Sequence, residues 1–322
     1  MRRLLSALLL LPMLWACSGN DDTSVPARVV PVYRIMASYA DLDTAEQDSV
    51  FRADSVEIEA FMRTVSELPC DRELIAGWSA SQVVEVFTPD VDSVFADTTY
   101  LAKSLGRILA SAGKQGLDFP RRRYAAVVYG RPESILFVDS VMLIALNHYL
   151  GADYPGYSHW PAYMRAHKTP AALPCDIAEA LTATAYPYAA EGADATLASR
   201  LLYEGALAHA KTLLTGCTPA QALGYTDDAY RQRLADEAML WHALIGADLL
   251  YDTSPAVADR LVAPAPRTSI NGTPAPGRIG RFIGYRIVQS YLSTHPTDLS
   301  TLLSPAFYTS PATLPSSAYN PG

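Results

Sequence analysis

Apolar and polar positions follow two different periods along this chain. Up to residue 138, β-branched runs alternate with stretches of helical spacing, and beyond residue 140 the apolar residues recur almost wholly at helical intervals. Runs typical of strands lie at residues 29–35, 83–87, 124–128 and 135–138. The pattern therefore predicts an α+β fold that is predominantly α-helical, with a small β-sheet in the N-terminal half.

The helical spacing predicts a series of helices with proline and glycine between them. No internal repeat appears and no linker is long enough to separate two domains, so we expect a single domain over residues 29–304. Residues 305–322 contain four prolines and no clear periodicity, which predicts a loosely packed, Pro-rich C-terminal tail. The predicted helices cover residues 43–50, 55–68, 93–113, 140–150, 160–167, 175–186, 196–214, 227–250 and 278–293.

The N-terminus has the pattern of an export signal. Arg2 and Arg3 precede an apolar run over residues 4–14, and a small residue, Ala16, stands before Cys17. A basic start, a short apolar segment and a small residue predict a signal peptide over residues 1–16, and the cysteine after it is typical of a bacterial lipoprotein. A transmembrane helix is the alternative, but it needs about 20 apolar residues.

A lipoprotein signal predicts where the protein is located and says little about its activity. We expect acylation of Cys17, a flexible tether over residues 17–28, and a membrane partner bound through the N-terminal acyl chains, because two or more chains anchor a protein stably. Ser18 after the cysteine favours the outer membrane of the cell envelope, and the pair Asp21-Asp22 is compatible with export to the surface. The body would face the periplasm or the exterior.

Charge and cysteine content narrow the possible partners. The net charge of −8 is dispersed along the chain and argues against a nucleic acid, which would need a basic face. Cys70, Cys175 and Cys217 cannot all pair, and none has the CxxC spacing of metal or redox sites. The simplest interpretation is one optional disulfide, for example Cys175–Cys217, and a buried thiol.

Familiar catalytic motifs are missing from the sequence. It contains no GxSxG elbow, no GxxxxGK[ST] loop and no GxGxxG after a strand. Gly277, Gly280 and Gly284 recur at intervals of three and four, which predicts a helical stripe where another element approaches closely. Packing is therefore the preferred interpretation of these glycines, ahead of an anion-binding loop.

Five segments, in their order and spacing, give the chain a family resemblance. Together with the lipoprotein signal they resemble the gliding-motility lipoprotein B (GldB) family, over residues 29 to 303. The segments are Asn147-His148-Tyr149-Leu150-Gly151-Ala152-Asp153-Tyr154-Pro155, Leu201-Leu202-Tyr203-Glu204-Gly205, Asp236-Glu237-Ala238-Met239-Leu240-Trp241, Leu249-Leu250-Tyr251-Asp252-Thr253 and Pro276-Gly277-Arg278-Ile279-Gly280-Arg281-Phe282-Ile283-Gly284.

The resemblance implies a degenerate zincin-like metallopeptidase fold, since the family is similar to predicted zinc peptidases of that type. Such enzymes carry HExxH on one helix and a third ligand, often Glu, on a second. The matching positions here are Ala178-Glu179-Ala180-Leu181-Thr182, with Glu204 on the second helix. Both ligand histidines are absent, and no histidine lies between His167 and His209. We therefore expect no metal and no other cofactor.

The candidate residues follow from this comparison. A degenerate cleft would be formed by Ala178, Glu179, Thr182, Tyr203 and Glu204. Arg278 and Arg281 are candidates for holding a carboxylate, with Glu204 or Glu237 as the partner within the fold, or the terminus of a partner protein. The other candidates for structural or recognition roles, taken from the matching segments, are Asp153, Tyr154, Glu237 and Trp241.

These expectations combine into a functional prediction. The chain would be a non-catalytic pseudo-metallopeptidase of the cell envelope that acts as a binding or assembly component with an envelope protein partner. The resemblance links it to gliding motility or associated secretion machinery. The alternative is a peptidase-like envelope hydrolase that uses an atypical carboxylate or metal site.

Overall fold

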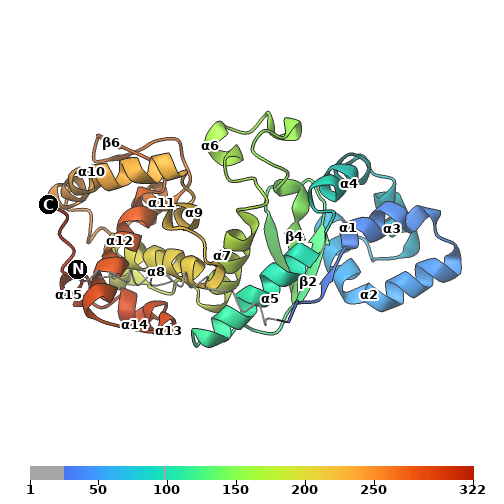
Figure 1. Cartoon of the computed structure of the whole chain (residues 1–322), viewed down its shortest axis with the longest axis horizontal. Helices are drawn as coiled ribbons and strands as arrows, with labels where there is room; N and C mark the ends of the chain where they lie inside the picture. Colours follow the sequence, from blue (N-terminus) through green and yellow to red (C-terminus); the bar gives the residue numbers. More distant parts are fainter. Residues whose placement is uncertain (1–24, 98) are drawn as a thin grey trace, which may run out of the picture.

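A computed structural model describes residues 25–97 and 99–322 (Figure 1). The molecule is elongated, with the N-terminal helices at one end, a sheet in the middle and the C-terminal helices at the other end. The predicted signal peptide, Cys17 and residues 17–24 of the tether lie outside the described residues.

A four-stranded mixed sheet forms the middle of the molecule, with strand order β1-β2-β4-β3. β1 (Val29–Val30) and β4 (Val141–Ala145) both run parallel to β2 (Arg123–Val127), and β3 (Ile135–Val138) is antiparallel to β4. Every residue of β4 is buried, which explains its uninterrupted apolar sequence. The strands predicted at residues 124–128 and 135–138 are confirmed.

The N-terminal helices correct several predictions. Only two residues of the strand predicted at 29–35 are extended, because the helix α1 buries Val32, Tyr33 and Met36 on one face. Residues 83–87 are helical in α4, whose Val84, Thr88 and Val91 are buried at helical spacing. The helices predicted at 43–50 and 55–68 form one helix with a non-helical residue at Asp54. The helices are α1 (Val32–Ser38), η1 (Tyr39–Asp41), α2 (Thr44–Val65), α3 (Arg72–Ser79), α4 (Gln82–Val94) and α5 (Thr99–Lys114).

The helix predicted at residues 140–150 is wrong. Residues 141–145 form β4, and a 3-10 turn, η2 (Leu146–His148), follows. Asp139, between β3 and β4, adopts a left-handed conformation with φ 51° that closes the hairpin. A short apolar run has the same appearance in a buried strand and in a buried helix, so periodicity could not separate the two.

The C-terminal half is helical, as predicted for residues 160–167, 175–186, 196–214, 227–250 and 278–293, with small differences at the ends. Most residues of α8 (Leu197–Thr215) are buried, because α5, α7, α9 and α12 pack around it. The other elements are η3 (Pro155–Tyr157), α6 (Ala162–Arg165), α7 (Leu173–Ala185), η4 (Gly192–Asp194), α9 (Pro219–Leu223), α10 (Asp227–Gly246), α11 (Pro255–Val262), β5 (Thr268–Ile270), β6 (Thr273–Ala275), α12 (Ile279–Thr294), α13 (Leu299–Leu302), α14 (Pro305–Tyr308) and α15 (Thr313–Ser316).

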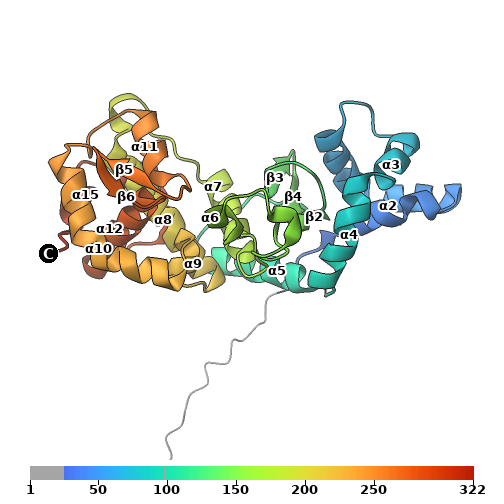
Figure 2. The same cartoon turned by 90° about the horizontal axis from the view of Figure 1, so that it is seen from above.

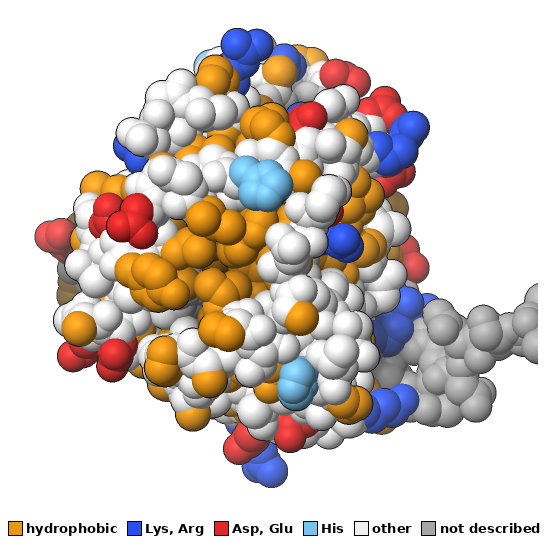
Figure 3. Space-filling model, turned by 90° about the vertical axis from the view of Figure 1, so that its left-hand side faces the viewer, with side chains coloured by type: hydrophobic (Ala, Val, Ile, Leu, Met, Phe, Trp, Pro, Cys, Tyr) orange, Lys and Arg blue, Asp and Glu red, His pale blue; other side chains and the backbone are white. Residues whose placement is uncertain are grey.

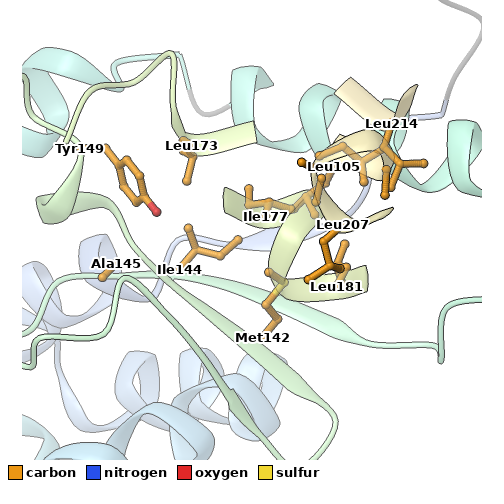
Figure 4. Close-up of a cluster of buried hydrophobic side chains, with 14 of the residues drawn as sticks. Leu105, Met142, Ile144, Ala145, Tyr149, Leu173, Ile177, Leu181, Leu207 and Leu214 are labelled. Atoms are coloured by element: carbon orange, nitrogen blue, oxygen red, sulfur yellow. The ribbon is translucent and has the colours of Figure 1, made fainter. Parts of the chain in front are cut away.

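Helix α7 connects the sheet to the C-terminal helices, between which it lies in Figures 1 and 2. Its Leu173, Ile177 and Leu181 are fully or almost fully buried at intervals of four, on the side toward the sheet. Figure 4 shows them beside Met142 and Ile144 of β4 and near Leu207 of α8. This apolar contact fixes which face of α7 points away from the sheet.

Close contact between α8 and α12 depends on glycine. A Cβ on Gly284 would lie 1.9 Å from the carbonyl oxygen of Leu201, and one on Gly205 would lie 2.2 Å from the carbonyl oxygen of Gly284. Gly280 is also covered by Leu201. The predicted packing stripe is therefore confirmed for Gly280 and Gly284, whereas Gly277 precedes the helix and packs against Ala265.

The C-terminal segment is packed, so the predicted loose tail at residues 305–322 is wrong. Phe307 and Tyr308 are buried in the core. Pro305 opens the short helix α14, a position where proline costs no hydrogen bond. Tyr319 donates a hydrogen bond to Glu237 of α10 at 2.8 Å. The aromatic residues of this segment therefore indicate its packing better than its prolines do.

The surface on the C-terminal side is partly apolar. Figure 3 shows hydrophobic side chains gathered on the face that looks left in Figure 1. Met239 and Ile245 of α10 are among the exposed apolar residues. Within residues 25–97 and 99–322, no helix combines the length and the apolar character needed to cross a membrane.

Candidate functional site

A buried ionic cluster lies where α7, α8 and α12 meet. Arg281 of α12 reaches both predicted carboxylates: its Nη2 donates to Oε1 of Glu179 at 2.8 Å, and its Nε lies 2.8 Å from Oε2 of Glu204. Glu204 is almost completely buried. One guanidinium therefore holds the two acidic side chains together.

The remaining carboxylate oxygens are paired as well. Lys211 Nζ donates to Oε2 of Glu179 at 2.6 Å, and Arg200 Nε donates to Oε1 of Glu204 at 2.9 Å. Lys211 is buried, which makes this contact a shielded ion pair. All four carboxylate oxygens of Glu179 and Glu204 thus contact a cation.

These charges set the protonation of the cluster. Burial alone would raise the pKa of Glu179, but the positive charges of Arg281 and Lys211 outweigh it and hold the pKa well below its usual range. Burial alone would lower the pKa of Arg281, but Glu179 and Glu204 outweigh it and raise the pKa. Both groups remain charged at neutral pH, and Glu179 is a poor proton acceptor.

Local sequence explains the arrangement. Because Leu173, Ile177 and Leu181 fix one face of α7 toward the sheet, Glu179 falls on the side toward α12. On α8, Arg200 and Glu204 are one turn apart, and Lys211 follows two turns after Glu204. The three positions share one face of the helix, which meets Arg281.

The cluster forms the floor of a cavity of about 200 Å³. Asp176 and Glu179 of α7 line it, together with Lys211 and the two arginines of the segment before and within α12, Arg278 and Arg281. Glu204 does not line the cavity and lies behind Arg281.

Comparison with known families identifies the relationship. A family model described as gliding motility protein GldB matches residues 30–321. The chain belongs to this family. No match was found among curated proteins or among solved structures. The GldB assignment predicted from the five segments is confirmed, and the zincin-like similarity stays a prediction.

Other predicted cleft residues of this GldB-family chain lie in its core. Ala178 and Thr182 are fully buried, and neither lines the cavity. Tyr203 is buried, donates to the carbonyl oxygen of Tyr186 at 2.9 Å, and packs against Tyr188 and Tyr308. Of the five residues predicted to form the cleft, only Glu179 faces the cavity.

The two predicted arginines have different roles. Arg281 pairs with Glu204, as the sequence suggested. Arg278 is not on the helix: it caps α12 in a left-handed conformation with φ 60°, and its Nη1 donates to the carbonyl oxygen of Gly224 at 3.0 Å. Glu237 pairs with Arg286 instead, at 2.8 Å.

The remaining candidates lie away from the cavity. Trp241 is buried and packs edge-to-face against Tyr319, with ring centroids 5.0 Å apart. Tyr154 donates a hydrogen bond to Asp90 at 2.5 Å, and Asp153 is exposed. These residues of the GldB motifs hold the fold together or lie at the surface.

Several residues of the site were not predicted from sequence. Lys211 and Arg200 complete the ion pairs. Asp176 accepts a hydrogen bond from Tyr149 at 2.9 Å, and burial raises the pKa of Asp176. A signal existed for two of them, since Arg200, Glu204 and Lys211 are spaced by four and seven and are the only Asp, Glu, Lys or Arg residues of α8.

Metal donors do not converge among the described residues. No three His, Cys, Asp or Glu side chains of residues 25–97 and 99–322 are grouped so that they could hold a metal ion. His209, five residues after Glu204, contacts Gln289 at 3.1 Å. The optional Cys175–Cys217 disulfide is not formed, and Cys70, Cys175 and Cys217 are thiols.

Proposed function

We propose that this GldB-family chain is a lipid-anchored cell-envelope protein that acts as a non-catalytic binding or assembly component linked to gliding motility or associated secretion. Family membership supports the link to gliding. The signal pattern ending at Cys17 supports the lipid anchor and, with Ser18, the outer membrane.

One observation carries the non-catalytic part of the proposal: each carboxylate oxygen of Glu179 and Glu204 contacts a cation of the protein itself. A general base must be able to take a proton from a bound substrate or water, and a metal ligand must turn its lone pairs to the ion. Arg281 and Lys211 pair with Glu179, and Arg281 and Arg200 pair with Glu204, which argues against either role for these carboxylates.

We further propose that the chain descends from a metallopeptidase, as the family resemblance implied. Helices α7 and α8 pack side by side, and Glu179 and Glu204 approach each other through Arg281, at the positions matching a catalytic Glu and a third ligand. In this proposal the guanidinium supplies the positive charge that a zinc ion supplies in the related enzymes. The competing proposal, an atypical carboxylate hydrolase, requires one carboxylate free to exchange protons.

A complementation experiment separates the two proposals. The double variant Glu179→Gln Lys211→Gln removes the proton acceptor and its buried counter-charge together, while amide groups keep hydrogen bonding possible. When it is produced at the wild-type protein level in a strain lacking the gene, this variant should restore the wild-type phenotype. The matched control is Asp228→Asn Arg231→Gln, an exposed ion pair with the same change in charge. Failure of the first variant alone, at normal protein level, would contradict a non-catalytic role.

The anchor has its own test. Cys17→Ser should move the protein from the membrane fraction to the soluble fraction, whereas Cys70→Ser should leave it membrane-bound. Wild type and Cys17→Ser that fractionate alike would contradict lipid anchoring through this residue.

A further inference from the structure

Three adjoining cavities form one cleft beside the ionic cluster. They measure about 200, 210 and 250 Å³, and each is lined in part by His167 and Gly224 or Gln221. The walls come from residues 163–172, residues 221–233 and the segment 264–278, and Arg278 lines two of the three cavities. Of the three cavities, the one of about 200 Å³ is lined by Asp176 and Glu179 of α7.

Positive charge is in excess along this cleft. Its lining includes five cationic side chains and three carboxylates, the latter being Asp176, Glu179 and Asp227. Arg281 and Lys211 are paired with Glu179. Among the described residues, Arg278 and Lys168 have no carboxylate partner within ion-pair distance. The cations on the walls are Lys168, Lys211, Arg233, Arg278 and Arg281.

The backbone holds Arg278 in place from one edge of its guanidinium. Nη1 donates to the carbonyl oxygen of Gly224 at 3.0 Å and lies 1.5 Å from where a Cβ on that glycine would be. Within residues 25–97 and 99–322, no hydrogen-bond acceptor contacts its Nε or Nη2. The fixed guanidinium thus keeps its second edge for an acceptor from outside the chain.

Lys168 lines the 200 Å³ cavity together with Arg278 and is also held in place by a hydrogen bond. Its Nζ donates to Ser134 Oγ at 2.6 Å and lies 5.3 Å from the centre of the Trp160 ring. An ammonium carries three N–H donors, so this hydrogen bond leaves others for a ligand. Burial lowers the pKa of Lys168, and an anion next to it would counter that effect.

We propose that this cleft binds a peptide segment that ends in a free carboxylate, with the carboxylate between Arg278 and Lys168. This rests on the proposed binding function and names the chemistry of its ligand. Asp176 and Glu179 share the wall and would repel a doubly charged group more than a singly charged one. The adjoining walls include Tyr225 and Pro264, which suit the side chains of a peptide leading away from its terminus.

The test uses the full-length chain in detergent and four probes: N-acetyl-tetra-alanine as the free acid, the same peptide as its carboxamide, acetate, and inorganic phosphate. Binding is measured by equilibrium dialysis and by the rise in melting temperature. The free acid should bind, the carboxamide should bind at least tenfold more weakly, and acetate should compete with the acid. Equal binding of acid and carboxamide, binding of phosphate without the acid, or no binding of the acid would each overturn the proposal.

Variants assign the binding to this cleft. Arg278→Gln and Lys168→Gln should each weaken binding of the free acid about tenfold or more, because each removes a charge-assisted hydrogen bond. Arg231→Gln, an exposed cation outside the cleft, should leave it unchanged. Melting curves without peptide identify a variant that fails to fold. Arg278 has a left-handed backbone conformation that its substitution could disturb, whereas Lys168 does not, so the Lys168 variant tests the proposal separately. Unchanged binding in both folded variants would overturn the proposal.

The outcome is distinguishable from failure of the proposed function. Peptide binding together with failed complementation by Glu179→Gln Lys211→Gln would keep the ligand assignment and reject the non-catalytic role. Successful complementation without binding of the free acid would do the reverse.

Discussion

Arg281 is the residue on which the candidate site depends most. It pairs with the buried Glu204 and with the partly exposed Glu179. Its loss would leave Glu204 with Arg200 as its counter-ion and Glu179 with Lys211. We expect Arg281→Met to lower the free energy of unfolding by about 3 kcal/mol, the usual cost of breaking a buried pair. Urea denaturation measures this change.

The control for this prediction is Arg231→Met, which breaks the exposed pair with Asp228. Its effect should be below about 1 kcal/mol. If the two variants change stability equally, the cluster around Arg281 is not the buried ionic contact described above.

His167 gives a pH-dependent test. Burial, followed by the charges of Arg278 and Lys211, lowers its pKa to about 4. The unfolded chain, with a pKa of about 6.5, takes up this proton first as the pH falls. Stability should therefore decrease from pH 6.5 toward pH 4, and His167 should account for about 1.4 kcal/mol per pH unit within that window.

Replacing His167 measures how much its imidazole contributes to the dependence of stability on pH. His167→Gln should reduce the slope of stability against pH between 4 and 6.5 by about one proton, while the buried His148, with its pKa also lowered to about 4, keeps part of the slope. Tyr163→Phe, another change in the wall of the cleft, should leave the slope as it is. An unchanged slope in the His167 variant would show that this histidine is not buried among cations.

At this scale the sequence predicted the acidic half of the site better than the basic half. Glu179, Glu204 and an arginine partner were predicted from spacing and family resemblance, and Arg281 fulfils that role. Lys168 was missed because it lies outside regular helices and strands, and its hydrogen-bond partner Ser134 precedes it by 34 residues. Tertiary contacts of this kind leave no local pattern.

At the scale of elements, the contact between α8 and α12 is the most constrained. Gly284→Ala would place a Cβ 1.9 Å from a backbone oxygen of Leu201, which no rotamer change can relieve. We expect a loss of about 3 kcal/mol or more, at the upper end for overpacking. Gly113 of α5 is the control, because a Cβ added there would have no other atom within 4 Å. Gly113→Ala should therefore raise the free energy of unfolding by roughly 0.5–1 kcal/mol. Thermal and urea unfolding of both variants measure the contrast.

Gly284→Ala that is as stable as wild type would contradict the close approach of the two helices. The variant also bears on the site, because Arg281 stands one turn before Gly284 on α12. Separation of the helices would move Arg281 away from Glu204, so reduced stability should come with a weaker ion pair.

Elements with strong helical spacing were predicted well, and the failures share a cause. α8 and α12 match their predicted ranges within a few residues. The errors at β4 and α4 concern short apolar or β-branched runs, whose state is decided by what covers them. β4 is buried on both faces, so no alternation of polar residues marked it as a strand.

At the scale of the whole molecule, the fold places a helical C-terminal half against a small sheet, with α7 between them. Fold class, predominance of helix and family were predictable from sequence. The packing of residues 305–322 was not, because Phe307 and Tyr308 find their partners on distant helices. The proline content of the segment does not show whether its aromatic side chains are buried in the core.

The central claim is that protein cations, and not a metal ion, hold Glu179 and Glu204 together. The most direct measurement is the elemental metal content of the full-length chain purified without chelators, followed by zinc titration monitored by thermal unfolding. We predict no stoichiometric zinc and no rise in melting temperature on titration. Near-stoichiometric zinc that is lost in the variant Glu179→Gln would contradict the account.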